Sequence, residues 1–290
     1  MKKIFLILII FGVFLSPYVI KRILKRSNIF KSTYIHNQIK NKTLDYIIIG
    51  SSRGLTTLNT NLIDSLTGLN GFNASTDGAG LGTNILMFHH LIQNNINFRN
   101  IILVLDPIGI DDERAQFSKN TYRFFPFCSE KYFNQEIKKF EKTKERSNFL
   151  ASYYYPGFTL FENNTVLFPS SLKALINPRS RNRFDEKGNY SYPMSKKASK
   201  LIAFDTVRFN TYGKLFEDFQ KTCRKHNIQL TTYITPIEGT YLKLPRTPNL
   251  INHSDLLVDC KYFADELHVN PLGRELATKR FVEDWIKKSP

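Results

Sequence analysis

Residues 44–54 read Leu-Asp-Tyr-Ile-Ile-Ile-Gly-Ser-Ser-Arg-Gly, an apolar run that breaks into a short polar turn. The run predicts a buried strand, and a tight turn after such a strand can present a side chain at the open edge of a sheet. A glycine-rich turn of this kind can also bind an anion through its backbone N–H groups, although the spacing matches neither a P-loop nor a dinucleotide fingerprint. Taken alone, such a turn is more often structural than catalytic.

A second informative stretch, Asp265-Glu-Leu-His268, stands just before Pro271 near the other end of the chain. A surface pair, or a histidine capping the helix expected from Pro271, is its default interpretation. A loop before the last helix would nevertheless emerge at the carboxyl edge of the sheet, where open α/β sheets bind ligands. A spacing of three lets the two side chains meet across one turn, with Asp265 orienting His268 as base for a serine.

Between these stretches, apolar strand patterns alternate with amphipathic helix patterns. This alternation predicts a doubly wound, three-layer α/β/α fold with a mainly parallel sheet. The expected strands are residues 44–49, 71–75, 100–105 and 228–235; the expected helices are residues 55–66 and 85–96, one or two within 199–226, and 271–288; residues 236–252 are expected to be a loop.

Residues 110–197 depart from this rhythm, so the predicted α/β domain, residues 44–288, would carry an insertion there. The insertion is expected to be partly helical around 130–148 and to roof or line one edge of the core. It is rich in aromatic residues, including Tyr153 to Tyr155, Phe158, Phe161 and Phe168. These predict core or lid positions, with a carbohydrate- or acyl-chain-binding surface as the alternative.

The N-terminus carries an uncharged run from Ile4 to Ile20, flanked on both sides by lysine and arginine. A run of this length is at the lower limit for a helix that spans a bilayer. No small-x-small cleavage site follows it, which argues against a cleaved signal peptide. We therefore predict an uncleaved membrane anchor within residues 1–26 and a connector over 27–43. The bulk of the chain would then lie outside the cytoplasm, on the periplasmic or extracellular side of a bacterial inner membrane.

Composition narrows the classes of function. The formal net charge is +16, but lysines and glutamates are interleaved over residues 136–146, which is typical of a solvated helix face. Nucleic acid is therefore an unlikely partner from the sequence. A basic protein that binds nucleic acid or a lipid surface remains the third hypothesis. The three cysteines form no C-x-x-C pair, and His36, His226 and His253 lack partners at metal-ligand spacing. We predict neither a metal nor a cofactor.

The two end stretches resemble those of the SGNH (GDSL-type) hydrolase superfamily. Gly50-Ser51-Ser52 stands where that superfamily has its Gly-Asp-Ser-like block, so the resemblance implies Ser52 as nucleophile. Asn73-Ala-Ser-Thr-Asp-Gly78 is close to its glycine block, which implies the N–H groups of Gly78 and Ser52 as oxyanion donors. Asp265 and His268 match its terminal block. The resemblance covers roughly residues 44–110 and 200–288.

One block departs from the family pattern. The third block usually supplies an asparagine, whereas this chain has Leu105-Asp106-Pro107 after the expected strand. The Gly-Ser-Ser variant with an N-terminal anchor is similar to a branch that includes the D-alanyl-transfer protein of teichoic acid modification and proteins of exopolysaccharide acetylation. Members of that branch work beside membrane-bound O-acyltransferases. The resemblance thus implies a serine esterase or O-acyltransferase acting on acyl groups of an anionic or acylated polysaccharide.

Two further expectations concern the same region. Arg53 and Asn73 are candidate substrate-binding residues, and a surface salt bridge is an equal alternative for Arg53. The missing asparagine also supports a second hypothesis: a non-catalytic partner that keeps the fold and binds polymer or a membrane acyltransferase.

Overall fold

The computed structural model describes residues 2–107, 110, 117–140, 142–194 and 197–288, and the chain divides into two compact units. Unit 1 comprises residues 1–41, 89–95 and 117–182. Unit 2 comprises residues 42–88, 96–116 and 183–290. The N-terminal segment and most of the predicted insertion therefore form one unit, and the α/β region forms the other.

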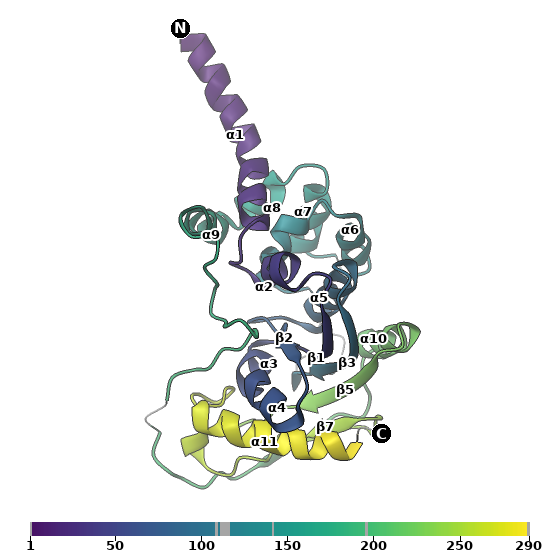
Figure 1. The fold of residues 1–290 in the computed structure, drawn as a ribbon. Coiled ribbons are helices and arrows are strands. Elements are labelled where there is room, and N and C mark those ends of the chain that lie inside the picture. The colour runs from purple at the N-terminus through teal and green to yellow at the C-terminus, as the bar shows by residue number, and fades with distance from the viewer. Residues whose placement is uncertain (1, 108–109, 111–116, 141, 195–196, 289–290) are drawn as a thin grey trace. The chain divides into compact units, whose positions relative to one another are not determined.

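Unit 2 contains a five-stranded, fully parallel sheet in the order β2-β1-β3-β5-β7 (Figure 1). Its strands are β1 (Thr43–Ile49), β2 (Gly71–Asn73), β3 (Asn97–Val104), β5 (Gln229–Ile234) and β7 (Leu250–Asn252). The chain adds β2 on one side of β1 and β3 on the other, so the order reverses between β1 and β3. Open α/β sheets bind ligands at the carboxyl ends of strands at such a reversal.

Helices pack on both faces of this sheet. On one face, Tyr46 and Ile48 of β1 pack with Ile63 of α4 (Thr60–Thr67) and Phe281 of α11 (Pro271–Lys288). On the other face, Phe88 of α5 (Leu81–Gln93) contacts the rings of Phe98 and of Phe219 in α10 (Lys214–Lys225). Strands buried on both faces need apolar side chains in both directions, which explains the unbroken run of isoleucines in β1.

Three stretches of the chain differ from the expectations. The helix expected over 55–66 is two helices, α3 (Ser52–Thr57) and α4, because Asn59 lies in extended backbone and its side chain accepts from the Asn61 N–H. The expected loop 236–252 contains β6 (Thr240–Lys243) and β7, and β7 completes the sheet by pairing with β5. Residues 199–226 contain one helix, α10, which agrees with the expected one or two, but they also contain the unexpected strand β4 (Asp205–Arg208), which pairs with β6.

Unit 1 is helical, and its N-terminal helix α1 (Lys2–Lys25) packs against several of its other helices. The others are α2 (Lys31–Tyr34), the π-helix η1 (Ile35–Ile39), the 3-10 helix η3 (Lys119–Phe127), α6 (Lys131–Ile137), α7 (Lys144–Ser152), α8 (Gly157–Glu162) and α9 (Asn164–Ile176). Among the described residues, no helix combines the length and the apolar character needed to cross a membrane.

The segment that the sequence indicates as a connector is folded into this unit. Residues 31–39 form α2 and η1, and the side chains of Ile29, Phe30 and Ile35 are buried. Near the end of α1, Ile20 and Leu24 are buried as well. Unit 1 is thus built around the segment that follows the apolar N-terminal run.

Candidate active site

Ser52 begins α3 directly after β1, at the carboxyl edge of the sheet where the strand order reverses. Ser51 precedes it in extended backbone and caps the helix, its Oγ accepting from the Arg53 N–H at 3.1 Å. Serine at this position satisfies an N–H group that lacks an intrahelical partner. The two serines therefore differ in role: Ser51 is buried and caps the helix, whereas Ser52 is half-buried.

Close packing explains the two glycines that bound this turn. A Cβ on Gly50 would lie 2.8 Å from Cβ of Val104, and one on Gly54 would lie 2.6 Å from Oγ of Ser75. Both contacts are shorter than van der Waals distance, so the turn requires glycine on either side of the serines. Residues 50–54 thereby pack against the carboxyl end of β3 and against the loop that follows β2, which fixes where α3 starts.

Asp265 and His268 share a short loop that is closed by backbone hydrogen bonds. Phe263 and Val269 form an antiparallel bridge, and the Ala264 N–H donates to the His268 carbonyl at 2.8 Å. The Asp265 Oδ1 accepts from the Leu267 and His268 N–H groups, each at 2.8 Å. Aspartate is well suited to such a turn because its side chain can accept from N–H groups two and three residues ahead.

The capping residue of α11 anchors this loop to the core. The Asn270 Oδ1 accepts from the N–H groups of Leu272 and Gly273, and its Nδ2 donates to the Lys261 carbonyl at 2.6 Å. Pro271 occupies the first helical position, where its missing N–H costs nothing. Asn270 is fully buried, so the position of the aspartate–histidine loop follows that of a buried helix end.

The structure brings Ser52, His268 and Asp265 together. The Ser52 Oγ lies 2.8 Å from Nε2 of His268, whose Nδ1 lies 2.9 Å from both carboxylate oxygens of Asp265. An ionised carboxylate only accepts, so Nδ1 carries the proton and donates to Asp265. In the neutral imidazole Nε2 then accepts from the Ser52 hydroxyl.

Exposure and charge differ within this group. The His268 side chain is 13% exposed and that of Asp265 is 52% exposed. Partial desolvation opposes ionisation of Asp265, but hydrogen bonds from His268 and from the Leu267 and His268 N–H groups outweigh it and lower the pKa of the carboxyl. Asp265 is therefore held in the ionised form that accepts the imidazole proton.

Arg53 lies beside this group but is buried. Its guanidinium donates to the Thr235 carbonyl at 2.9 Å and to the Pro236 carbonyl at 3.4 Å. Nε lies 3.6 Å from Oδ1 of Asp106, the residue found where the third family block has asparagine. Burial lowers the pKa of Arg53, against the attraction of Asp106. Arg53 thus ties the start of α3 to the segments that follow β3 and β5.

Asn73 and Gly78, the two other predicted site residues, lie at the end of β2 and in the loop that follows it. The Asn73 side chain is fully buried, donating to the Gly54 carbonyl at 2.9 Å and accepting from the Ser75 N–H. Gly78 is exposed in a turn, with φ of +61°, where glycine is unstrained. The Thr76 N–H donates to the Gly50 carbonyl at 3.0 Å, so this loop is bound directly to the turn that carries Ser52.

One aromatic residue of the site was not predicted. The Tyr192 ring lies over the His268 imidazole, with ring centroids 4.8 Å apart. Partial burial, together with the carboxylates of Asp77 and Asp265, raises the pKa of Tyr192. Tyr192 comes from the turn-prone section of the predicted insertion, where the sequence offers no periodic pattern. Only the folded chain reveals its position.

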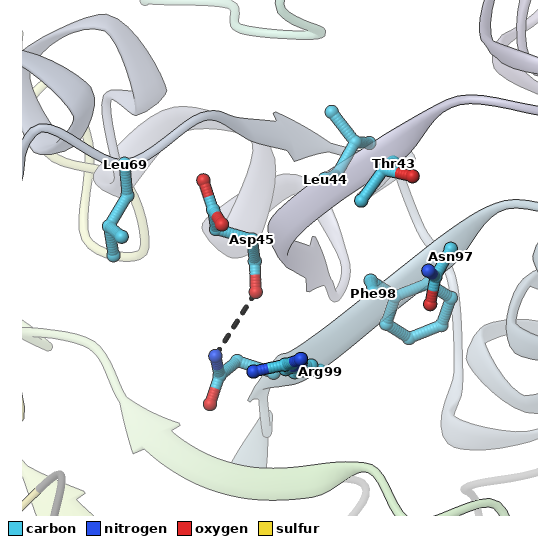
Figure 2. Close-up of a pocket in the computed structure, with 8 residues that line it drawn as sticks. Thr43, Leu44, Asp45, Leu69, Asn97, Phe98 and Arg99 are labelled. Atoms are coloured by element: carbon cyan, nitrogen blue, oxygen red, sulfur yellow. Dashed lines mark hydrogen bonds between the residues drawn. The ribbon is translucent and has the colours of Figure 1, made fainter.

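Unit 2 also has a cavity of about 480 Å³ at the amino ends of β1 and β3 (Figure 2), lined by residues including Thr43, Asp45 and Phe98. It lies at the opposite ends of these strands from Ser52, and the Asp45 carbonyl accepts there from Asn100.

Among the described residues, no group of three or more His, Cys, Asp or Glu side chains could hold a metal ion.

Comparison of the chain with protein-family models and with curated proteins gives no match. The α/β fold with its five-stranded parallel sheet is consistent with SGNH-like folds.

Proposed function

We propose that this chain is a serine esterase or O-acyltransferase of the SGNH type. One observation carries the proposal: Ser52, His268 and Asp265 form a continuous chain of hydrogen bonds of 2.8 and 2.9 Å at the ligand-binding edge of the sheet. A nucleophile bonded to a base, with the base oriented by a third group, is the geometry of nucleophilic acyl transfer. An ordinary surface pair of aspartate and histidine would not be expected to meet a helix-starting serine.

The proposed reaction has two steps. The Ser52 Oγ attacks an acyl carbonyl while Nε2 of His268 takes its proton, and Asp265 stabilises the imidazolium that forms. His268 then gives the proton to the leaving alcohol, and the acyl group stays on Ser52 as an ester. In the second step water or a sugar hydroxyl attacks that ester, His268 takes its proton, and Ser52 recovers its hydrogen. Water would make the chain an esterase, and a sugar hydroxyl would make it a transferase.

The oxyanion is assigned to the backbone N–H groups of Ser52 and Gly78 on the strength of the family resemblance. Asp106 cannot supply the side-chain N–H that an asparagine would, and its carboxylate faces Arg53 instead. Each oxyanion donor contributes on the order of 10²–10³ in rate. We therefore infer a slower enzyme toward simple esters than a family member with the full set of donors.

The cellular setting extends this proposal. Exposed apolar side chains along α1, such as Ile4, Phe5 and Phe11, support membrane attachment through residues 4–20. With the remaining chain outside the cytoplasm, the substrate would be an acylated or anionic cell-surface polysaccharide, served together with a membrane-bound O-acyltransferase. The excess of positive charge favours an anionic polymer.

Fluorophosphonate labelling of the full-length protein in detergent tests the proposal. The full chain is needed because Ile20 and Leu24 of α1 are buried in unit 1. We expect labelling of the wild type, loss of labelling in Ser52→Ala and His268→Ala, and retention in Ser51→Ala. Ser51 is a matched control, since it is the neighbouring serine and its Oγ is taken by the Arg53 N–H.

Two results would count against an enzyme. A folded wild type that resists labelling would favour the non-catalytic partner, whose distinguishing feature is the absent third-block donor. Labelling that survives Ser52→Ala would place the nucleophile elsewhere.

A further inference from the structure

An apolar stripe faces outward along α9, in unit 1. Its side chains follow the helical spacing i, i+4, i+7, i+8, and their exposed fractions range from 41% to 78%: Phe168, Leu172, Leu175 and Ile176. A different face of the helix, with Leu167 and Ala174, is already buried. A surface helix normally presents its polar side to water. The second apolar face of α9 therefore needs a covering from outside the unit.

Further exposed apolar side chains lie on and just before α8, which packs against α9. Phe158 and Phe161 are 49% and 44% exposed, and Tyr154, just before α8, is 81% exposed. We call these three residues together with the α9 stripe the α8–α9 apolar surface. Exposed apolar groups that gather in this way mark contacts with another protein or with a membrane.

Aromatic contacts join this surface to α1, which packs against both α8 and α9 (Figure 1). The Tyr155 ring lies 5.9 Å from Phe14, 6.0 Å from Tyr18 and 5.9 Å from Phe158, between ring centroids. The Tyr18 hydroxyl donates to the Tyr154 carbonyl at 3.4 Å. The α8–α9 apolar surface is thus continuous with the exposed apolar side chains of α1. Tyrosines gathered at the end of a long apolar run are typical of a membrane–water boundary.

Charge distinguishes between a bilayer and a protein as the covering. Residues 157–182 contain one acidic residue, Glu162, which is paired with Lys144 at 3.3 Å. Exposed basic residues border the surface on α9 and after it, at Lys173 and Arg179. A second copy of the chain would bring these like charges together, whereas anionic headgroups would neutralise them.

We propose that the α8–α9 apolar surface is inserted into the interfacial layer of an anionic lipid bilayer, beside the point where α1 enters it. Amphipathic helices that lie in the membrane plane bury their apolar face at the boundary between headgroups and acyl chains. Unit 1 would then have two contacts with the membrane, α1 and the α8–α9 surface. This inference does not depend on the chemistry of Ser52.

Tryptophan quenching by brominated lipids tests it on the full-length protein. The wild type has a single tryptophan, Trp285, which is buried in unit 2 and serves as an unquenched background. Leu172→Trp probes the stripe, Phe14→Trp probes α1, and Leu276→Trp is a control at an exposed apolar position of unit 2. Each variant is reconstituted into phosphatidylglycerol–phosphatidylcholine vesicles whose acyl chains carry bromine close to the headgroup.

The proposal expects Leu172→Trp to show blue-shifted emission that is lost with brominated lipid, while Leu276→Trp keeps its emission. Quenching at position 14 without quenching at 172 would overturn it and leave the α1 anchor standing. Quenching at neither position would overturn both the inference and the proposed membrane attachment. A blue shift at 172 without quenching, accompanied by cross-linking between copies or to a membrane protein, would assign the surface to a protein and overturn the proposal.

Discussion

Replacing Arg53 by methionine is expected to destabilise unit 2 by about 3 kcal/mol. The side chain is 6% exposed, and its guanidinium donates to the Thr235 carbonyl at 2.9 Å. A hydrogen bond from a charged group contributes about 1.5–3 kcal/mol, and breaking a buried ion pair costs about 3–5 kcal/mol. The 3.6 Å separation from the partly exposed Asp106 places the total near the lower end. Methionine keeps the apolar stem, so the loss reports on the guanidinium.

Urea denaturation followed by Trp285 fluorescence measures this loss. Trp285 is the only tryptophan and packs against Tyr46 and Phe281 in the core of unit 2, so its emission follows that unit. With a slope of about 2 kcal/mol per molar urea, the midpoint should fall by about 1.5 M. The double variant Arg53→Met/Asp106→Asn should recover about 1 kcal/mol, because it removes the carboxylate left without its cation.

A midpoint that falls by less than about 0.5 M, or roughly 1 kcal/mol on the same slope, would refute this reasoning. If the methionine variant instead kept the wild-type stability and bound substrate more weakly, Arg53 would be a substrate-binding residue, as the sequence allows. The two measurements therefore separate a residue that positions the turn from one that contacts substrate.

Three further predictions concern the loop, the turn and unit 1. Asp265→Asn should slow fluorophosphonate labelling by ~10³–10⁴-fold, because the amide can hold the imidazole in the wrong tautomer, while the thermal midpoint stays unchanged. Gly54→Ala should cost about 1–3 kcal/mol in Trp285-monitored denaturation, because a Cβ on Gly54 would lie 2.6 Å from Oγ of Ser75; a midpoint equal to that of the wild type would contradict this. Burial lowers the pKa of His90 to about 3. As the pH falls through 6.5, the His90 imidazole therefore takes up a proton in the unfolded chain but stays neutral in the folded chain. Between pH 7 and pH 5 this should remove about 2 kcal/mol of stability, measured by circular dichroism in urea, and His90→Gln should flatten that profile.

Local patterns in the sequence predict most of the sheet. The strands at 44–49, 100–105 and 228–235 match β1, β3 and β5 to within three residues, and the helix expected from Pro271 is α11. These elements carry strong signals because they are long and buried. By contrast, β7 has three residues, and only its pairing with β5 makes it a strand. A pattern of so few residues contains no period to detect.

The candidate site likewise has residues that the sequence indicates and residues that it does not. The order of the motifs predicts that the turn after the first strand and the loop with Asp265 and His268 meet at one edge of a doubly wound sheet, and the family resemblance implies Ser52 within that turn. The sequence could not indicate that Arg53 is buried, because that depends on carbonyl groups about 180 residues away. Tyr192 is hidden for a related reason: it reaches His268 from a segment without secondary structure.

The two proposals can be tested separately because they draw on different units. Ser52, His268 and Asp265, and the contacts that hold them, belong to unit 2. The α8–α9 apolar surface and α1 belong to unit 1. A soluble esterase would need only the residues around Ser52. The α8–α9 apolar surface and α1 would promote aggregation in water, because they expose large apolar side chains. Keeping both in one chain has a physical advantage if the acyl donor or acceptor lies at a membrane, since attachment confines the enzyme to that surface and raises the effective concentration of substrate. We therefore expect variants of the α8–α9 surface to leave fluorophosphonate labelling intact in detergent.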